Sequence, residues 1–292
     1  MIKKIFLILS IFFFFFLIVI IFSFKNFNQP TKKFYKENGF KIGTTIYPLY
    51  YFVSQISGNK NDIILILPAG SDPHNFDLNP EIFKKISQLD YLLITGLDID
   101  FWSSRITGVK TKVMTQGLDL IKEDSYPDPH FWFSLKENKK LAKNILDFFI
   151  LIDEKNKDYY EKNYKELISK LEKFDENLKI ELKDIKTRKL VLEHNFLNYF
   201  ARDYNFQILG VLEKENGDLT PQEIKNLIEE IKKNKIKVIF GEKFKTEGKV
   251  ENFAKDLNLK VYYLDNLETG EGDFFERYQE NIKIIKEALS VK

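Results

Sequence analysis

Histidine is rare in this 292-residue chain and occurs at His74, His130 and His194. Two of the three share one local sequence, Asp72-Pro73-His74 and Asp128-Pro129-His130. Proline fixes its own φ and restricts the residue before it, so each of these two histidines is expected on a stiff loop. Histidine is also the commonest metal ligand. The pattern predicts one metal site assembled by the fold; the alternative is that each histidine is an ordinary hydrogen-bonding loop residue.

Polar side chains also follow the ends of the expected strands. His194, Glu242 and Asp265 each come directly after one, and His74 and His130 lie in loops that follow two others. Ligands of open α/β sheets bind outside the carboxyl ends of the strands. We therefore expect a site between two halves of the chain, with His74 and His130 from the first half and the rest from the second.

Three imidazoles and one carboxylate make a set of three nitrogens and one oxygen, which suits tetrahedral Zn²⁺. The chain has no cysteine, so thiolate-ligated soft metals, iron–sulfur clusters and disulfides are excluded. Asp72 and Asp128 are possible further ligands, but aspartate before proline is a common turn residue, and we favour the turn. Phe76 and Trp132 are expected as walls of the site.

A mononuclear zinc hydrolase is the main rival among enzymes, with Glu242 as general base toward a metal-bound water. Against it, the sequence has no His-Glu-x-x-His pair, and Asp265 would fill the fourth metal position that catalysis needs open. We therefore expect a binding protein and not an enzyme.

Short β-rich segments alternate with helical ones, which predicts βαβ units with mainly parallel sheets. The expected strands are Lys41–Ile46, Asp62–Leu67, Tyr91–Thr95, Thr111–Thr115, Lys189–Glu193, Gln207–Leu212, Lys237–Gly241 and Lys260–Leu264. The expected helices are Leu49–Ser57, Asn79–Leu89, Leu135–Ile152, Asn195–Tyr204, Pro221–Lys233, Glu247–Asn258 and Asp273–Leu289, with a further helix near Phe101-Trp102.

Residues 154–186 carry apolar side chains at spacings of three and four with no proline or glycine, which predicts one long helix of roughly 48 Å. The βα alternation restarts directly after it. We interpret this segment as a strut between two lobes; a surface helix or a coiled-coil dimer is the alternative. The predicted fold is α/β, with two βα lobes of mainly parallel four-stranded sheets joined by one long rigid helix.

The N-terminus carries Lys3 and Lys4 and then an almost wholly apolar run over residues 5–24. This run is long enough to cross a bilayer, and no Ala-x-Ala-like site follows it. We predict a signal anchor or signal peptide at 1–25, a tether at 26–39, lobes at 40–153 and 187–292, and the linking helix at 154–186. The main part of the chain is expected outside the cytoplasm, as a monomer held at the membrane by residues 5–24. A cleaved signal is the alternative.

Lys3 and Lys4 account for the net charge of +2, so the rest of the chain is balanced. Lysines are interleaved with acidic residues, as on solvated helix faces, and there is no basic stripe of the kind that nucleic-acid binders show. We expect no nucleic-acid partner.

The chain resembles the metal-binding proteins of zinc and manganese ABC importers, the ZnuA/TroA-like, helix-linked class, from about Lys41 to its C-terminus. The resemblance rests on Thr44-Thr-Ile-Tyr-Pro-Leu-Tyr50, Leu67-Pro-x-Gly-x-Asp-Pro-His-x-Phe76, Gly96-Leu97, Asp128-Pro-His-x-Trp132, His194 with Phe196, Tyr199-Phe-Ala201, and Leu264-Asp265. It implies two α/β lobes with a metal ion between them and delivery of that ion to a membrane permease and its ATPase.

Residue by residue, the resemblance implies His74, His130 and His194 as nitrogen ligands and Asp265 as the carboxylate. Glu242 matches a family glutamate that either orients a ligand or replaces one. Manganese-preferring members often have glutamate at the third position, so His194 supports Zn²⁺, with Mn²⁺ or Fe²⁺ as alternative cargo. The chain lacks the histidine-rich loop of many zinc members, and without cysteine it has no site for a lipoprotein anchor. An adhesin with a structural metal is a further alternative.

Overall fold

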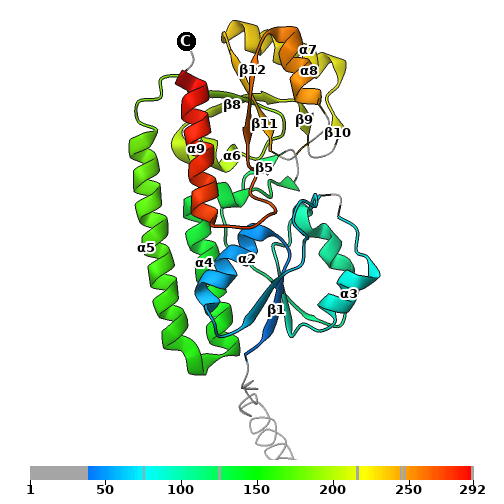
Figure 1. The fold of residues 1–292 in the computed structure, drawn as a ribbon, viewed down its shortest axis with the longest axis vertical. Coiled ribbons are helices and arrows are strands. Elements are labelled where there is room, and N and C mark those ends of the chain that lie inside the picture. The colour runs from blue at the N-terminus through cyan, green and yellow to red at the C-terminus, as the bar shows by residue number, and fades with distance from the viewer. Residues whose placement is uncertain are drawn as a thin grey trace, which may run out of the picture. The chain divides into compact units, whose positions relative to one another are not determined.

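The computed structural model of the chain describes residues 39–74, 76–123, 126–214, 217–243, 245 and 248–290. The first lobe is built on a four-stranded parallel sheet of order β2-β1-β3-β4 (Figure 1). Its strands are β1 (Lys41–Thr44), β2 (Asp62–Leu65), β3 (Tyr91–Ile94) and β4 (Lys110–Val113). A two-stranded antiparallel ribbon follows the sheet and is made of β5 (Lys122–Glu123) and β6 (Tyr126–Pro127).

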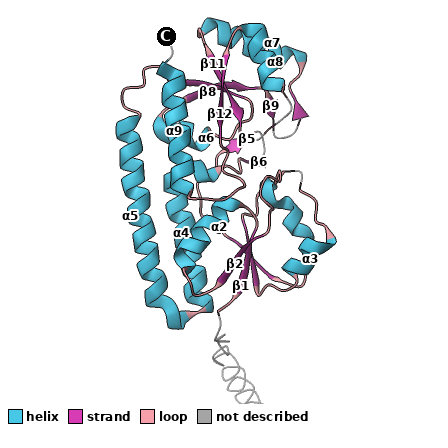
Figure 2. Cartoon of the chain, viewed as in Figure 1, coloured by secondary structure: helices cyan, strands magenta, loops and turns pink. Residues whose placement is uncertain are grey.

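Helices cover both faces of this sheet, as a parallel sheet requires (Figure 2). They are α2 (Tyr47–Ser57), α3 (Pro80–Ile86), α4 (Leu135–Ile152) and the 3₁₀ segments η1 (Asp98–Arg105) and η2 (Phe131–Phe133). The predicted start of α3 is confirmed, because the Asn79 side chain accepts the backbone N–H of Ile82 and Pro80 opens the helix. The helix expected near Phe101-Trp102 is η1, in which Trp102 is buried and Phe101 is exposed.

The long helix is shorter than predicted. A 3₁₀ turn, η3 (Glu154–Asn156), leads into α5 (Lys157–Glu181), whose 25 residues span about 38 Å. Its buried residues Tyr160, Leu167, Leu171 and Leu178 form one stripe, and α5 packs with it along α4 and α2 of the first lobe. The helix therefore packs along the first lobe, and it also reaches the second lobe through Glu181, which binds Gln279 and Lys286 of its last helix.

The second lobe repeats the architecture with a parallel sheet of order β12-β11-β7-β8. Its strands are β7 (Lys189–Leu192), β8 (Gln207–Val211), β11 (Val238–Glu242) and β12 (Lys260–Leu264), and a small antiparallel ribbon pairs β9 (Glu213–Lys214) with β10 (Gly217–Asp218). Its helices are α6 (Asn198–Tyr204), α7 (Pro221–Lys233), α8 (Lys249–Leu257) and α9 (Phe274–Ser290). The capping box predicted at the start of α7 is present, with Thr220 and Glu223 as its partners.

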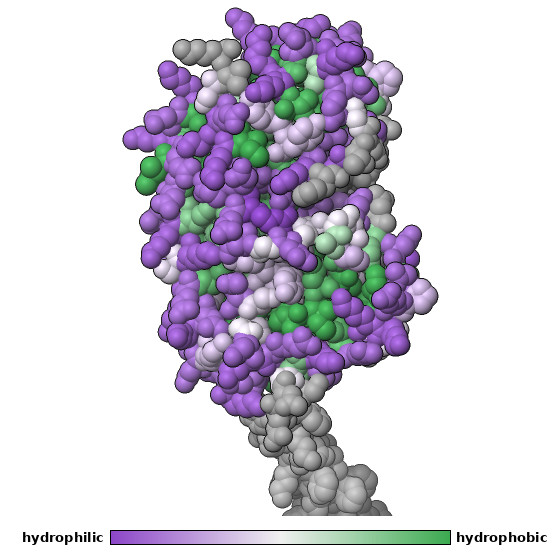
Figure 3. All heavy atoms as spheres, in the orientation of Figure 1, coloured by the Kyte–Doolittle hydropathy of each residue, from purple (hydrophilic) through white to green (hydrophobic). Residues whose placement is uncertain are grey.

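One apolar cluster runs through both sheets and the helices between them. Aromatic rings join its two halves: Phe133 contacts Phe196 and Tyr278, and Phe52 contacts Phe274. Polar and charged side chains cover most of the face in Figure 3, with apolar side chains gathered over the first lobe. The predicted α/β fold with two parallel four-stranded sheets and a long helix is confirmed.

The predicted signal segment at 1–25 and the predicted tether, apart from Gly39, lie outside the described residues. In the ranges that the structure does describe, no helix combines the length and apolar character needed to cross a membrane. The lobe boundaries at 40–153 and 187–292 stay predictions.

Candidate metal centre

The repeated Asp-Pro-His sequence forms the same local structure twice. The backbone N–H of His74 donates to Asp72 Oδ1, and that of His130 donates to Asp128 Oδ1, each over 2.8 Å. These are the side-chain-to-backbone bonds of an Asx turn, which aspartate favours two residues before the donor. The turn interpretation of both aspartates is confirmed, and each histidine projects from a stiffened loop.

The fold brings all three histidines together. His74 lies on the loop after β2, His130 directly precedes η2, and His194 lies two residues beyond β7. Their ring centroids are 5.1–5.8 Å apart, and one ligand nitrogen from each lies within 4.8 Å of the other two. A tetrahedral zinc ion with nitrogens at about 2.0–2.1 Å would set them about 3.3 Å apart. Small side-chain movements are therefore enough to reach that geometry.

Burial differs among the three rings and shows where the site opens. His130 is fully buried, His194 is 8 % exposed, and the His74 side chain is 23 % exposed. A cavity of about 240 Å³ reaches His74 and His194. Its other lining residues are Gly70, Ser71, Asp72, Glu213, Lys214, Glu242, Lys243, Lys245, Asn266, Glu268 and Thr269. The site is thus closed at His130 and accessible past His74.

Two carboxylates orient two of the rings. Asp128 Oδ1 lies 2.9 Å from Nδ1 of His130, and Glu242 Oε1 lies 2.5 Å from Nδ1 of His194. An ionised carboxylate only accepts, so a proton on each Nδ1 satisfies these two pairs and leaves the opposite nitrogen, Nε2, for a cation. In His130 that nitrogen meets Glu268 instead, so binding a cation there requires Nε2 without a proton. Such carboxylate–histidine pairs fix the tautomer and raise the basicity of the ligand nitrogen. Glu242, whose role the sequence left open between orienting and binding, contacts the His194 ring here.

Glu268, which the sequence analysis did not single out, lies against two of the histidines. Its Oε1 is 3.0 Å from Nε2 of His130 and 3.6 Å from Nε2 of His74, and the residue is buried. Burial by itself raises the pKa of the Glu268 carboxyl, but the hydrogen bonds and charges of His130 and His74 outweigh it and hold the pKa well below its usual range. A cation held by the two imidazoles would meet an ionised carboxylate at this point.

Asp265, the predicted carboxylate ligand, has other partners in this structure, and its assignment as a ligand stays a prediction. Arg277 donates to both of its oxygens over 2.8 Å, and the backbone N–H of Leu267 donates to Oδ1 over 2.9 Å. The loop after β12 then turns through Leu267, whose φ of 62° is left-handed, and presents Glu268 to the histidines. The sequence carries a weak signal for Glu268, since this loop also contains Glu268, Glu271 and Asp273. Which of them faces the histidines cannot be predicted from residue types alone.

Trp132, predicted as a wall of the site, lies against His130 with ring centroids 5.2 Å apart. Its indole Nε1–H donates to the carbonyl of Asn266 in the loop that carries Glu268. Phe76, the other predicted wall, packs instead on Trp102 of η1, with centroids 5.0 Å apart.

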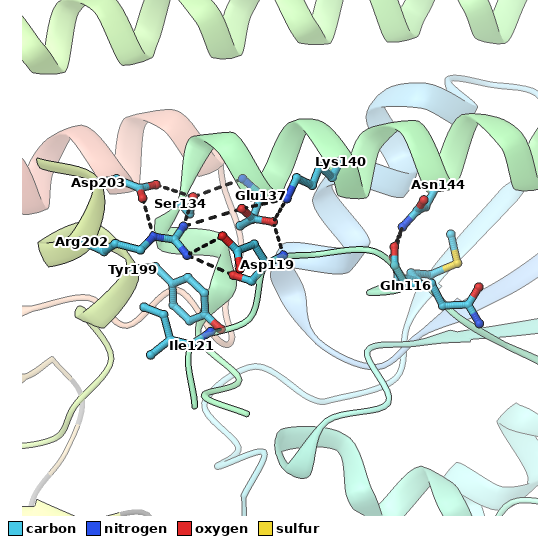
Figure 4. Close-up of polar contacts among 11 residues, drawn as sticks. Gln116, Asp119, Ile121, Ser134, Glu137, Lys140, Asn144, Tyr199, Arg202 and Asp203 are labelled. Carbon is cyan, nitrogen blue, oxygen red and sulfur yellow. Dashed lines mark hydrogen bonds and ion pairs between the residues drawn. The ribbon is translucent and has the colours of Figure 1, made fainter. Parts of the chain in front are cut away.

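Helix α6 of the second lobe holds the segment that leads to His130 (Figure 4). The Tyr199 hydroxyl accepts the backbone N–H of Ile121. The same hydroxyl donates to the carbonyl of Asp128 over 2.7 Å. The Asn198 amide donates to the other oxygen of Asp128, and Arg202 donates to the carbonyl of Asp119. Residues of one lobe therefore set the position of a histidine that belongs to the other.

Buried charges support this contact. Glu137, fully buried at the start of α4, accepts the backbone N–H of Asp119 and lies 3.7 Å from Arg202 (Figure 4). Arg202 also donates to the Ser134 hydroxyl, which in turn donates to Asp203. The loop between β4 and His130 is thus held by α4 through Glu137 and by α6 through Arg202.

Comparison with known proteins agrees with this arrangement. A family model described as zinc-uptake complex component A, periplasmic, matches residues 42–288. The metal ABC transporter substrate-binding lipoprotein FimA of Streptococcus parasanguinis is 31% identical over 277 residues, which cover 86% of this chain and 89% of FimA. The manganese ABC transporter substrate-binding lipoprotein PsaA of Streptococcus anginosus is 30% identical over 262 residues, 80% of this chain and 84% of PsaA.

Solved structures show the same fold. A zinc-bound ZnuA deletion mutant superposes with a TM-score of 0.79 at 26% identity and covers 87% of this chain and 99% of its own. The zinc-bound ZnuA-like domain of AdcA from Streptococcus pneumoniae gives 0.73 at 25% identity, with 87% and 100% covered.

These matches confirm the predicted family, whose members are extracytoplasmic substrate-binding proteins of ABC metal importers and not enzymes. The match spans both sheets and every residue of the histidine cluster. The chain therefore belongs to the family of zinc-uptake complex component A, the periplasmic metal-binding components of ABC importers.

Proposed function

We propose that this protein captures Zn²⁺ with His74, His130, His194 and Glu268 and delivers it to the permease and ATPase of an ABC importer. The observation that carries the proposal is the convergence of three imidazoles with one buried carboxylate. Family membership supports the transport role, and the donor set supports the metal.

Zinc is favoured over manganese by the donor atoms. Three imidazole nitrogens and one carboxylate oxygen match the four-coordinate sites of Zn²⁺, whereas Mn²⁺ prefers sites rich in carboxylate, carbonyl and water oxygens. Relatives are named for manganese, and structural neighbours were solved with zinc bound. Mn²⁺ is therefore the alternative cargo, with Fe²⁺ behind it.

Glu268 takes the ligand position first predicted for Asp265. Its Oε1 faces the two nitrogens that would bind the ion, whereas both oxygens of Asp265 are engaged by Arg277. Glu242 is assigned to orienting His194. A fourth protein ligand also closes the position that a hydrolytic water needs, which argues against the zinc hydrolase.

We further propose that the protein acts as a monomer kept at the outer face of the membrane by residues 5–24. The relatives are named lipoproteins, while this sequence contains no cysteine to acylate. Cell fractionation of the full chain and of residues 26–292 tests the anchor: both chains in the soluble fraction would count against it.

The test of the cargo is a metal titration. The protein is stripped of metal and titrated with Zn²⁺ and Mn²⁺ by calorimetry, alongside His194→Ala, Glu268→Gln and, as a control, Glu280→Gln, an exposed α9 residue paired with Lys283. We expect one tight zinc site per chain, weaker Mn²⁺ binding, zinc affinity lost in the first two variants and kept in the third. Tighter binding of Mn²⁺ would overturn the cargo, and unchanged zinc affinity in His194→Ala would overturn the site.

A further inference from the structure

The loop after β12 offers two carboxylates to the edge of the sheet where the histidines meet. Asp265 directly follows the strand and Glu268 comes three residues later. Glu268 faces the histidines, and Asp265 is turned into an ion pair with Arg277 of α9. Of these two carboxylates, Glu268 is therefore the one that contacts the histidines in this structure.

Arg277 holds Asp265 through a two-pronged contact. Its Nε donates to Oδ2 and its Nη2 to Oδ1, each over 2.8 Å, which is the planar fork geometry that makes arginine–carboxylate pairs strong and specific. The guanidinium itself is fixed by the Tyr47 ring, whose centroid lies 4.5 Å away. Arg277 Nη2 also donates to the carbonyl of Thr269, so the arginine secures the loop on both sides of Glu268.

The backbone of Asp265 is fixed independently of Arg277. The Asn281 side chain accepts the Asp265 N–H and donates to the Asp265 carbonyl, over 2.8 and 2.7 Å. With the main chain held at this point, loss of the arginine would leave the side chain of Asp265 held by the backbone N–H of Leu267 alone, and would also release the carbonyl of Thr269. That side chain starts from the carboxyl end of β12, next to β11, which ends in Glu242, the partner of His194.

We propose that Arg277 is a specificity-determining residue, which keeps the metal site at three nitrogens and one carboxylate by withholding Asp265 from the ion. The inference rests on the proposed zinc function and deepens it. A second carboxylate in the site would raise the number of oxygen donors and the coordination number. That change favours Mn²⁺, which takes oxygen-rich octahedral sites, and disfavours the four-coordinate geometry of Zn²⁺.

The test compares Arg277→Met with the double variant Arg277→Met/Asp265→Asn in the full-length chain, purified in mild detergent. Methionine keeps the length of the side chain without its charge or donors. The readout is the ratio of Zn²⁺ to Mn²⁺ affinity from competition with a chromophoric chelator. The visible spectrum of bound Co²⁺ is a second readout, because tetrahedral Co²⁺ absorbs far more strongly than six-coordinate Co²⁺.

We expect Arg277→Met to lower the zinc-to-manganese affinity ratio by about tenfold or more, in the range seen when partners of metal ligands are removed, and to weaken the Co²⁺ band. The double variant should restore both, since asparagine supplies no carboxylate. An unchanged ratio in a folded Arg277→Met protein would overturn the proposal. So would a lowered ratio that persists in the double variant, because that result would trace the effect to loosening of Glu268.

Arg277→Lys is a second variant that can be measured if Arg277→Met does not fold. Circular dichroism checks the folding of both variants. Lysine keeps the charge but cannot form the fork, so a smaller drop in the ratio is expected, again cancelled by Asp265→Asn. If Arg277→Met fails to fold, an unchanged zinc-to-manganese affinity ratio in Arg277→Lys counts against the proposal. The proposed function fails separately, if the unaltered chain binds neither metal tightly.

Discussion

The contact between α6 and the His130 segment allows a sharp test with Tyr199→Phe. Tyr199 is fully buried, and its hydroxyl bridges the N–H of Ile121 and the carbonyl of Asp128 over 3.1 and 2.7 Å. The backbone N–H of Asp128 donates back to the carbonyl of Ile121, so the hydroxyl closes the open end of a small ring of backbone bonds. Phenylalanine keeps the aromatic packing and removes only the oxygen.

The magnitude follows from the two backbone groups left without this partner. A buried donor or acceptor that loses its hydrogen bond costs about 1–3 kcal/mol, and the two groups are neighbours that can relax together. We therefore expect the free energy of unfolding to fall by roughly 2–4 kcal/mol. For a domain of this size that corresponds to a drop in Tm on the order of 5–15 °C.

The assay is urea unfolding of the metal-free protein, followed by circular dichroism. Tyr263→Phe is the matched control, because Tyr263 is 39 % exposed and its hydroxyl donates to Glu251 at the surface. We expect that control to change the free energy of unfolding by less than about 0.5 kcal/mol. If Tyr199→Phe unfolds at the same urea concentration as Tyr263→Phe, the bridge does not stabilise the lobe contact and our assignment is wrong.

Two further predictions concern zinc binding directly. Glu242→Gln should weaken zinc affinity by about 10-fold or more, because the amide still accepts from Nδ1 of His194 but no longer raises the basicity of its Nε2. Competition with a chelator measures the affinity, and the control Glu280→Gln should bind zinc like the unaltered protein. Zinc affinity should also fall as the pH drops from about 7.5 to about 5.5, since the histidines must be neutral to bind. The pKa of Glu268 is lowered, so this carboxylate stays ionised through that pH window. The stability that the ionised carboxylate gives the fold is lost only at lower pH, as the pH falls from the ordinary pKa of a glutamate through the lower pKa of Glu268 in the folded protein. Glu268→Gln should thus lower zinc affinity at every pH and leave its pH slope unchanged; a flattened slope in calorimetric titrations would assign the dependence to Glu268.

The parts of the fold that the sequence predicted are those with local causes. Strands and helices followed apolar periodicity and capping residues such as Asn79 and Thr220, and the strands began and ended within a few residues of the predicted positions. The clustering of the three histidines was predictable because strand ends in parallel sheets meet at one edge. Each of these inferences needs only neighbouring residues and a general rule of sheet topology.

The long helix shows where a periodic pattern misleads. Leu182 and Ile185 continue the apolar stripe, which is why the helix was expected to reach residue 186. The chain instead leaves α5 at Glu181 through short turns. Arg188 then donates to the carbonyl of Leu182 and to that of Tyr204, which draws the chain toward β7. The end of the helix therefore involves a contact with Arg188, a residue outside the apolar pattern of the helix.

Our proposal of Glu268 in place of Asp265 has a similar origin. The strand-end rule selected the acidic residue nearest to β12, but the partner of that residue, Arg277, arrives from α9 twelve residues later in the chain. The left-handed turn at Leu267 then decides which side chain faces the histidines. Neither the pairing nor the turn has a signature in residue types, so this part of the site needed three-dimensional coordinates.

The contacts between the lobes bear on how the ion reaches its site. Tyr278 donates to the carbonyl of Phe133, Trp132 donates to that of Asn266, and the Tyr47 N–H donates to that of Glu268. Moving the lobes apart would break these bonds, and they lie close to His130, the most deeply buried ligand. The interface therefore holds the lobes together in addition to α5. His74 is the most exposed of the three histidines and lines the cavity, so we expect the proposed ion to exchange with solvent past the loop of His74.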